Sequence, residues 1–376
     1  MTICFFSAQY LPTPGGVERY TWNLARKAVQ HGCRALVVTS VLPGLPEQET
    51  DPDGIEIFRL PVWPVMKGRF PVPKPGGRFA ALERRIFAQS VDLCVVQTRM
   101  YVESVWAARA AKRRGIPAVV IDHSTGYMPM GGGVIGLAGR MYEHAACALV
   151  RRTGAPFYGV SLASCRWLKT FGINARGTMP NAIDPDTLAA ELAAPQPPEL
   201  TRAALCPNGE KLVVFLGRMI PEKGIRELAA AVSALPGVVL AAAGDGPLLE
   251  PLRAEAPPRV HYLGALDHGQ AVRLLAGADC YCLPTRYAEG LPTTLLEAAG
   301  CGCPILCTPT AGTEELLPGQ SAFFLPDTAP DAIRAGLQAL LENPAEAQKR
   351  AAAAKQNALA HFTWDAMFDK LIQGHG

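Results

Sequence analysis

Short apolar runs of strand length alternate along the whole chain with segments of helical periodicity. The apolar runs are nearly continuous, which is typical of strands buried on both faces of a parallel sheet. Strands are predicted at residues 3–7, 35–39, 55–60, 93–97, 118–122, 158–161, 211–216, 238–243, 260–263, 280–284, 304–307 and 322–325. Helices are predicted between them, among others at residues 17–30, 104–114, 225–235, 270–276 and 293–300.

This alternation occurs twice, so we expect an α/β protein with two Rossmann-like domains that face each other across a cleft. The predicted boundary follows residue 179 and precedes the Pro-rich stretch 195–198. The N-terminal domain then spans residues 1–179 and the C-terminal domain residues 180–361. Ligands of such sheets bind at the carboxyl ends of the strands, so the chemistry is expected there.

The chain has 376 residues, of which 49% are hydrophobic and 18% charged, with a formal net charge of +3. This balance excludes a disordered, highly charged chain and argues against a nucleic-acid-binding protein. No uncharged run that is also free of Gly and Pro approaches the length of a membrane-spanning helix. The N-terminus resembles an opening strand and not a signal peptide, so a cytoplasmic location is expected.

Residues 66–85 differ from the rest, because six basic residues stand there against the single acid Glu83. The basic residues are Lys67, Arg69, Lys74, Arg78, Arg84 and Arg85. They could form a surface for anionic lipid headgroups or an acidic acceptor, which would make the protein peripheral on the inner face of the membrane. They could equally be a solvated loop that leads into a helix.

No metal site is predicted. The eleven cysteines include no CxxC pair, and the cluster from Cys301 to Cys307 lies in apolar sequence, so buried thiols are expected. The two Asp-x-Asp strings, at residues 51–53 and 184–186, each contain a proline and are interpreted as turns.

The densest chemical signal lies in residues 284–298. A strand ends near Pro284, a loop carries Glu289, and Pro292 is expected in the first turn of a helix. The N–H groups of Thr293 and Thr294 at that helix start would form an anion site. Glu297 lies further along the helix, where its carboxylate could accept hydrogen bonds from the hydroxyl groups of a ribose.

Other candidates also follow strand ends. Arg218 and Lys223 flank the turn after strand 211–216, where both could reach one diphosphate. Gly244 follows strand 238–243 and permits close backbone approach, although it could be structural. In the N-terminal half, Gly15 and Gly16 precede a helix, and His123 follows strand 118–122, where a structural histidine is the alternative.

Taken together these motifs resemble the retaining, nucleotide-sugar-dependent glycosyltransferases of family 4, which have the GT-B fold. The resemblance runs through almost the whole chain in order, over residues 15–18, 123, 160–161, 180–184, 217–224, 244–247, 262–264, 289–297 and 298–304. It implies that Arg218 and Lys223 bind the donor diphosphate and that Glu297 binds the ribose.

The resemblance also assigns the remaining donor residues. Glu289 and the backbone of Leu291, Pro292, Thr293 and Thr294 would hold the donor sugar and phosphate. The glycines 15 and 16 would approach the diphosphate, and His123 would contact the sugar beside the reacting carbon. The base would lie near His261 and Leu263. The C-terminal helix, residues 362–376, would cross back to the N-terminal domain.

The function implied is metal-independent transfer of a hexose-type sugar from a nucleoside-diphosphate sugar, with no cofactor, and with catalysis carried by His123, Arg218, Lys223 and Glu289. The acceptor would be a hydroxyl of a lipid-linked, cell-envelope or polysaccharide molecule bound by the N-terminal domain. Two alternatives are a nucleotide-sugar epimerase on a GT-B-like fold and a catalytically silent paralogue that binds nucleotide sugar.

Overall fold

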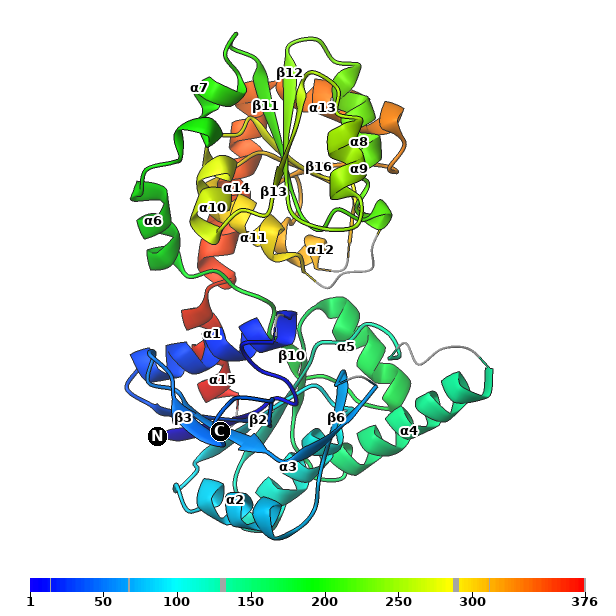
Figure 1. The fold of residues 1–376 in the computed structure, drawn as a ribbon. Helices are drawn as coiled ribbons and strands as arrows, with labels where there is room; N and C mark the ends of the chain where they lie inside the picture. The colour runs from blue at the N-terminus through cyan, green and yellow to red at the C-terminus, as the bar shows by residue number, and fades with distance from the viewer. Residues whose placement is uncertain (14, 67, 129–132, 287–290, 311, 375–376) are drawn as a thin grey trace. The chain divides into compact units, whose positions relative to one another are not determined.

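Two parallel β-sheets organise the chain in the computed structural model, which describes residues 1–13, 15–66, 68–128, 133–286, 291–310 and 312–374 (Figure 1). Each sheet belongs to a separate compact unit. Unit 1 consists of Met1–Pro180 and Trp364–Gly376, and unit 2 of Asn181–Thr363. The chain therefore leaves unit 1 after residue 180, where the sequence predicts 179, and returns after residue 363, where it predicts 361.

The sheet of unit 1 is parallel except for its edge strand β3, with the order β10-β9-β8-β7-β1-β2-β4-β3. Its strands are β1 (Thr2–Phe6), β2 (Arg34–Ser40), β3 (Gln48–Thr50), β4 (Glu56–Leu60), β7 (Leu93–Gln97), β8 (Ala118–Asp122), β9 (Phe157–Gly159) and β10 (Gly177–Thr178). The chain reverses direction across the sheet between β1 and β7, so this is the topological switch point.

Helices cover both faces of this sheet. They are α1 (Gly16–Gln30), α2 (Gly77–Phe87), α3 (Val102–Arg114), α4 (Gly133–Arg151), α5 (Leu162–Leu168) and α15 (Trp364–Gln373). One core cluster joins Leu82 of α2, Ala108 of α3 and Cys147 of α4 to Phe6 and Val96 of the sheet. In Figure 1, α1 and α15 lie above the sheet and α2 and α3 below it.

Residues 66–85 lead into a helix, α2, as one of the two interpretations expected, but the part before it is not a loop throughout. It contains strand β6 (Phe70–Pro73), which forms a separate antiparallel hairpin with the preceding strand β5 (Val62–Val65). Both strands contain proline, which is tolerated on the exposed edges of a two-stranded ribbon. Arg78 and Arg85 form ion pairs with Glu47, so part of the basic charge is neutralised within the unit.

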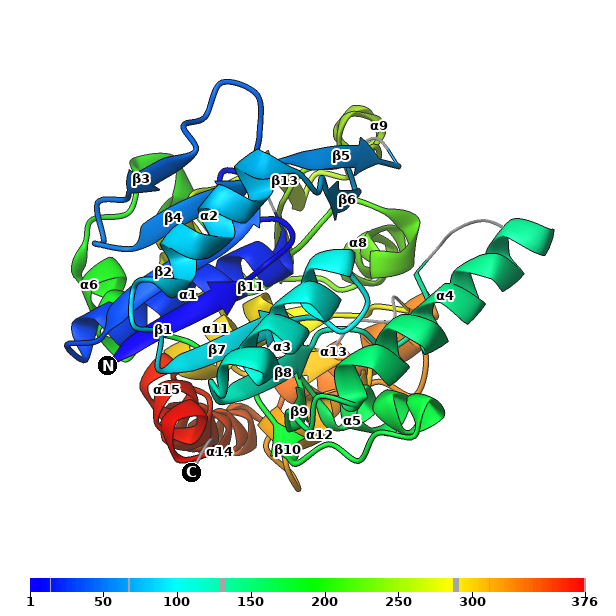
Figure 2. The ribbon, with the colours of Figure 1, turned by 90° about the horizontal axis from the view of Figure 1, so that it is seen from below.

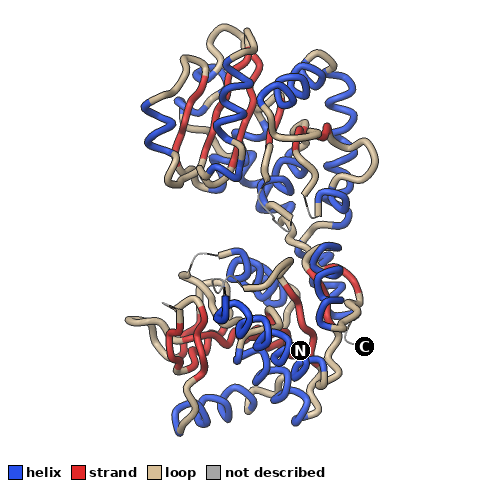
Figure 3. Tube along the Cα trace, turned by 90° about the vertical axis from the view of Figure 1, so that its right-hand side faces the viewer, coloured by secondary structure: helices blue, strands red, loops and turns tan. Residues whose placement is uncertain are grey.

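The sheet of unit 2 has six parallel strands in the order β13-β12-β11-β14-β15-β16, and Figure 3 shows these strands between layers of helix. The strands are β11 (Lys211–Leu216), β12 (Val238–Ala243), β13 (Val260–Gly264), β14 (Cys280–Leu283), β15 (Ile305–Cys307) and β16 (Phe323–Phe324). The helices are α6 (Pro185–Ala193), α7 (Arg202–Leu205), α8 (Ile225–Ser233), α9 (Leu249–Ala254), α10 (His268–Ala276), α11 (Thr293–Cys301), α12 (Thr313–Leu316), α13 (Pro330–Leu341) and α14 (Pro344–His361). The switch point lies between β11 and β14.

The C-terminal helix α15 belongs to unit 1. Trp364 is 4% exposed, and its ring packs edge-on against Tyr20 of α1 with 5.1 Å between centroids. Asp365 bonds Lys27 Nζ at 2.9 Å. Within the described ranges, no helix is both long and apolar enough to span a bilayer.

Replacing Trp364 by alanine is expected to destabilise unit 1 by about 3–5 kcal/mol, because a large buried ring is lost and a cavity is left. Urea unfolding followed by circular dichroism measures the change. Trp63→Ala is the matched control, because Trp63 is 46% exposed and its removal should cost less than about 0.5 kcal/mol. Equal losses in the two variants would contradict the role given to α15.

Candidate functional site

Three loops are hydrogen-bonded to one another at the carboxyl edge of the sheet in unit 2. The amide of Gly217, after β11, donates to Ala243 O at 3.0 Å, and Met219 N donates to Asp245 O at 2.8 Å. Gly244 N donates in turn to Gly264 O at 2.8 Å. The ends of β11, β12 and β13 therefore form one hydrogen-bonded rim beside the switch point.

Gly244 is needed for this rim. Its φ of 141° is unfavourable for other residues, and a Cβ atom there would overlap the carbonyl oxygen of Gly217. Gly224 plays the same part on the other side, because its φ is 70° and a Cβ would overlap the carbonyl oxygen of Pro284 after β14. Close backbone approach was predicted at Gly244, and here the approaching group is the neighbouring loop.

The two predicted diphosphate ligands stand on these loops. Arg218 lies exposed in the loop after β11, and Lys223 ends the 3₁₀ turn Pro221–Lys223. Lys223 is only 7% exposed, and a side chain at Gly217 would lie 3.9 Å from its Cε. Both cations are thus at the switch point of unit 2, where a doubly wound sheet binds its ligands.

Helix α11 begins beside them. Pro292 has φ −60° and ψ 128° and is the N-cap, so the prediction that it lies in the first helical turn was wrong by one residue. The Thr294 hydroxyl is 2.7 Å from Tyr281 Oη, which ties the helix start to β14. Leu291 is a buried core residue whose carbonyl oxygen accepts a hydrogen bond from Asn181. Thr293 is exposed.

Glu297 faces α10. Its Oε1 atom is 3.5 Å from Nε2 of His268, the first residue of that helix, which follows β13. His261 and Leu263, predicted to lie near the base, are half-buried on β13. The predicted ribose and base residues therefore belong to adjoining elements of unit 2. Glu289 lies outside the described residues.

In unit 1, Gly15 and Gly16 lie next to each other at the start of α1, but their surroundings differ. A Cβ on Gly15 would overlap the carboxylate of Glu18, which folds back over the helix start and is 7% exposed. Burial raises the pKa of Glu18. Gly16 is exposed, and a Cβ there would meet nothing within 4 Å. Among the described residues, no contact requires glycine at position 16.

His123 is held on two sides. Its Nε2 is 2.8 Å from Gln97 Oε1, at the end of the neighbouring strand β7, and Tyr20 packs against the ring with 4.8 Å between centroids. Burial lowers the pKa of His123 to about 3, so the imidazole is neutral at physiological pH. Sequence reasoning found His123 but missed Gln97 and Tyr20; the adjacency of β7 and β8 is the signal that could have found Gln97.

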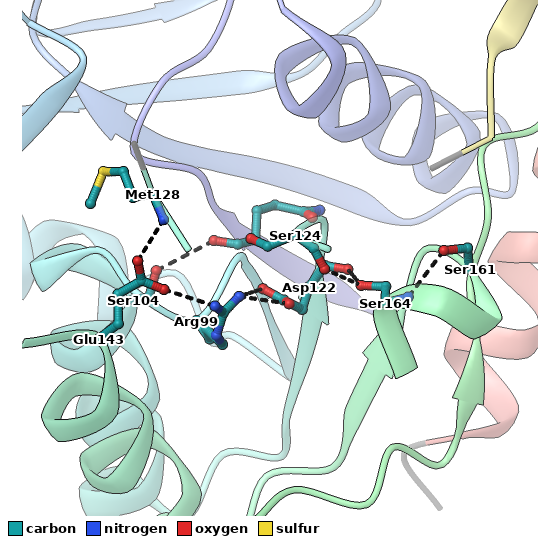
Figure 4. A network of polar contacts seen from close by, with 9 residues as sticks. Arg99, Ser104, Asp122, Ser124, Met128, Glu143, Ser161 and Ser164 are labelled. Atoms are coloured by element: carbon teal, nitrogen blue, oxygen red, sulfur yellow. Dashed lines mark hydrogen bonds and ion pairs between the residues drawn. The ribbon is translucent and has the colours of Figure 1, made fainter. Parts of the chain in front are cut away.

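An ion triad that the sequence did not reveal includes Asp122, the residue before His123 (Figure 4). Arg99 Nη1 contacts both carboxylate oxygens of Asp122, at 2.8 and 2.9 Å, and its Nη2 bonds Glu143 of α4 at 2.8 Å. All three side chains are at most 1% exposed. Glu143 also accepts the amide of Met128 at 2.7 Å, and Ser164 Oγ donates to the carbonyls of Asp122 and Ser124. The triad therefore fixes the loop that follows His123.

The Asp-x-Asp string at residues 51–53 is a turn, as predicted, and Asp51 accepts the amides of Asp53 and Ile55. The string at residues 184–186 was also predicted to be a turn, but it is the start of α6, with Asp184 as the N-cap. Among the described residues no three or more His, Cys, Asp and Glu side chains group as metal ligands would. The cysteines are free thiols, most of them buried, and burial raises the pKa of Cys301 to about 12.

Two family models match the chain. The model "Glycosyltransferase Family 4" covers residues 14–187, and the model "Glycosyl transferases group 1" covers residues 198–358. Between them they match most of unit 1 and most of unit 2.

Among curated relatives, the chain is 31% identical over 170 residues to a glycogen synthase of Mycobacterium tuberculosis, covering 43% of this chain and 41% of that protein. The match thus spans about two fifths of that relative. A GDP-mannose-dependent alpha-mannosyltransferase of Mycolicibacterium smegmatis is 25% identical over 388 residues, which cover 100% of this chain and 96% of that protein.

Among solved structures, HepE of Anabaena in complex with UDP matches with a TM-score of 0.74 at 18% identity, over 100% of this chain and 99% of that chain. The shared fold is GT-B.

The neutral state of His123 predicts its behaviour in solution. Its imidazole ¹⁵N shifts should stay constant from pH 8 to pH 5, because protonation is expected only near pH 3. Since the unfolded chain binds this proton at a higher pH, His123 should cost the folded state stability as pH falls below about 6.5. A titration midpoint above pH 5 would contradict the burial. Gln97→Leu should change the tautomer ratio without restoring the titration.

Replacement by alanine is expected to affect stability differently at Gly244 and at Gly16. Gly244→Ala should destabilise unit 2 by several kcal/mol, because backbone atoms must move to admit the methyl group. Gly16→Ala should change the free energy of unfolding by less than about 1 kcal/mol. Chemical denaturation of both variants tests the contrast, which fails if Gly16→Ala is the more destabilised of the two.

Proposed function

The chain belongs to the family 4 glycosyltransferases, and on this basis we propose that it transfers a hexose-type sugar from a nucleoside-diphosphate sugar to an acceptor hydroxyl with retention of configuration. One relative that aligns over almost its whole length is a GDP-mannose-dependent mannosyltransferase, and HepE was solved with UDP, so a nucleoside-diphosphate donor is supported by both. The observation that carries the proposal is the rim of unit 2, where Arg218, Lys223 and the start of α11 surround the switch point.

The rim suits the electrostatics of this reaction. Breaking the bond between the anomeric carbon and the donor oxygen places negative charge on the leaving diphosphate. Arg218 can bind phosphate oxygens with two parallel N–H groups, and Lys223 supplies a second positive charge. Thr293 and Thr294 are the first residues of α11, and the amides at a helix start can serve as further donors. Three fixed sources of positive potential can stabilise the leaving group, and we propose that no metal ion is required.

Within the donor complex, we assign the ribose to Glu297, the base to the region of His261 and Leu263, and the sugar to Glu289. His268 beside Glu297 would share the ribose hydroxyls or move aside for them. Gly244 acts indirectly, because it holds the loop that carries Arg218.

From unit 1 we assign Gly16 to the diphosphate and His123 to the donor sugar. A neutral imidazole bonded through Nε2 to Gln97 can hydrogen-bond a sugar hydroxyl, but it is a weak acid and a weak base. The acceptor proton therefore passes, in our proposal, to a donor phosphate oxygen on the face from which the leaving group departs. The acceptor is a lipid-linked, cell-envelope or polysaccharide molecule bound by unit 1.

The proposal is tested by a thermal-shift series with UDP, GDP, ADP, CMP and their sugar conjugates, in EDTA and in Mg²⁺. One nucleoside diphosphate should raise the melting temperature without metal, corresponding to about 2.7 kcal/mol at a hundredfold excess over Kd. Arg218→Ala should abolish most of this shift and lower sugar transfer about 10²–10³-fold. Arg334→Ala, an exposed arginine of α13 paired with Asp331, is the matched control. Near-normal turnover in Arg218→Ala would overturn the leaving-group account.

A further inference from the structure

Tyr20, in the second turn of α1, contacts His123 and two further parts of unit 1. Only 1% of its surface is exposed. Its ring lies 4.8 Å from the His123 ring and 5.1 Å from the Trp364 ring, centroid to centroid, and is nearly perpendicular to both. Its hydroxyl group donates a hydrogen bond to Met179 O at 3.0 Å. One buried side chain therefore joins the imidazole assigned to the donor sugar to residues 179 and 364.

These two partners of Tyr20 flank the connections between the units. The chain leaves unit 1 after residue 180 and returns to it after residue 363. Met179 therefore stands next to the outgoing segment, and Trp364 is the first residue after the returning segment. A displacement of either segment would act on Tyr20 through a direct contact.

Both connecting segments are held in place. In unit 2, Ile183 of the outgoing segment donates its amide to Phe362 O of the returning segment at 2.8 Å. In unit 1, α15 lies side by side with α1 (Figure 2), and Asp365 bonds Lys27 Nζ at 2.9 Å. Tyr20 thus contacts the anchored ends of both segments.

The His123 imidazole has two restraints, and they fix different properties of the ring. The hydrogen bond from Nε2 to Gln97 Oε1 makes Nε2 the protonated nitrogen and leaves Nδ1 as an acceptor. A single hydrogen bond still allows the plane of the ring to tilt. The perpendicular Tyr20 ring restricts this tilt, because an edge-to-face pair is favourable only over a narrow range of orientations. Burial raises the pKa of Tyr20, so its hydroxyl group stays protonated and remains a donor to Met179 O.

Helix α1 carries Tyr20 and a residue assigned to the donor on one face. Gly16, which we assign to the diphosphate, and Tyr20 are four positions apart, so they lie one turn apart on the same side of the helix. The rigid helix therefore fixes the distance between the diphosphate contact and the side chain that restrains His123.

We propose that Tyr20 is a positioning residue for the sugar transfer. It holds the His123 imidazole in the orientation in which Nδ1 accepts a hydrogen bond from a hydroxyl group of the donor sugar. It also ties this orientation to the two segments that connect the units. The inference rests on the proposed glycosyltransferase function. A Tyr20 with only a structural role would stabilise unit 1 but would have no effect on the rate that depends on His123.

The first test follows the imidazole ¹⁵N signals of His123 in the full chain at pH 7. The wild type should show one tautomer, protonated at Nε2. Tyr20→Leu removes both ring contacts and should move the two nitrogen shifts toward the average of the tautomers. Trp364→Leu acts on the far side of Tyr20 and should change the same signals in the same direction, to a smaller extent. Phe79→Leu, which loses an edge-on contact with Trp106 elsewhere in unit 1, is the matched control and should leave the signals unchanged.

The second test is a double-mutant cycle on sugar transfer to water, measured as release of UDP from UDP-glucose and of GDP from GDP-mannose. Tyr20→Leu should lower kcat about tenfold and change KM less than about twofold, because the orientation of His123 matters in the transition state. Tyr20→Phe keeps the ring and loses only the bond to Met179 O, so it should lower kcat about threefold. In the His123→Ala background both substitutions should lose their effect. Phe79→Leu should keep the wild-type kcat.

Three results would overturn the inference. The first is an unchanged set of His123 signals in Tyr20→Leu. The second is a loss of kcat that is as large in the His123→Ala background as in the wild type, since this would indicate a structural role. The third is a kcat of Tyr20→Leu equal to that of Phe79→Leu. If Tyr20→Leu does not fold, Tyr20→Phe decides both tests, because it keeps the buried ring.

Nucleoside-diphosphate binding supplies the separate readout for the proposed function. If a nucleoside diphosphate raises the melting temperature of the wild type and of Tyr20→Leu equally, and the cycle is additive, only the role of Tyr20 is lost. If the wild type releases no nucleoside diphosphate from either donor, the ¹⁵N signals alone decide whether Tyr20 orients His123. If the nucleoside diphosphates do not change the melting temperature of the wild type, the proposed function itself is contradicted, whatever the imidazole signals show.

Discussion

Backbone contact between neighbouring loops is the constraint on which unit 2 depends. Gly244 lies against Gly217, and Gly224 lies against Pro284, each at a distance that leaves no room for a Cβ atom. These contacts bring the ends of strands β11, β12 and β14 together at the switch point. The positions of Arg218 and Lys223 follow from them. A phosphate ligand needs fixed donors, and fixed loops reduce the cost of arranging those donors when charge develops.

In unit 1, a buried ion triad holds the residues after His123 in place. Arg99 compensates two buried carboxylates, so its removal would leave Asp122 and Glu143 without a cation in the interior, a loss of about 3–5 kcal/mol. Asp122 is the residue before His123, and Glu143 holds the amide of Met128. The segment 123–128 is therefore attached at both ends. His123 is oriented by Gln97, and a neutral, oriented imidazole is suited to hydrogen bonding and not to proton transfer.

Sequence patterns predicted the central strands well, because strands buried on both faces are continuous apolar runs. Strands 93–97, 118–122, 211–216 and 238–243 have the predicted bounds. The hairpin β5–β6 was missed, since its prolines and charges are typical of loops. Candidate residues next to strand ends could be named from the sequence. The partners of these residues could not, because Arg99 meets Asp122 and Glu143 only after 23 and 44 residues of chain have folded.

The same reasoning applies to the charged segment 66–85. A count of basic residues cannot tell that Arg78 and Arg85 pair with Glu47, whereas Arg69 stays at a pocket mouth. An apolar stripe on a helix normally predicts a core-facing side. In the first turns of α4 the apolar side faces solvent instead. The opposite side of the helix, which carries Glu143, must face inward to meet Arg99. The triad that fixes the loop after His123 thereby also fixes the rotation of α4, and that rotation directs residues 134, 137 and 141 outward.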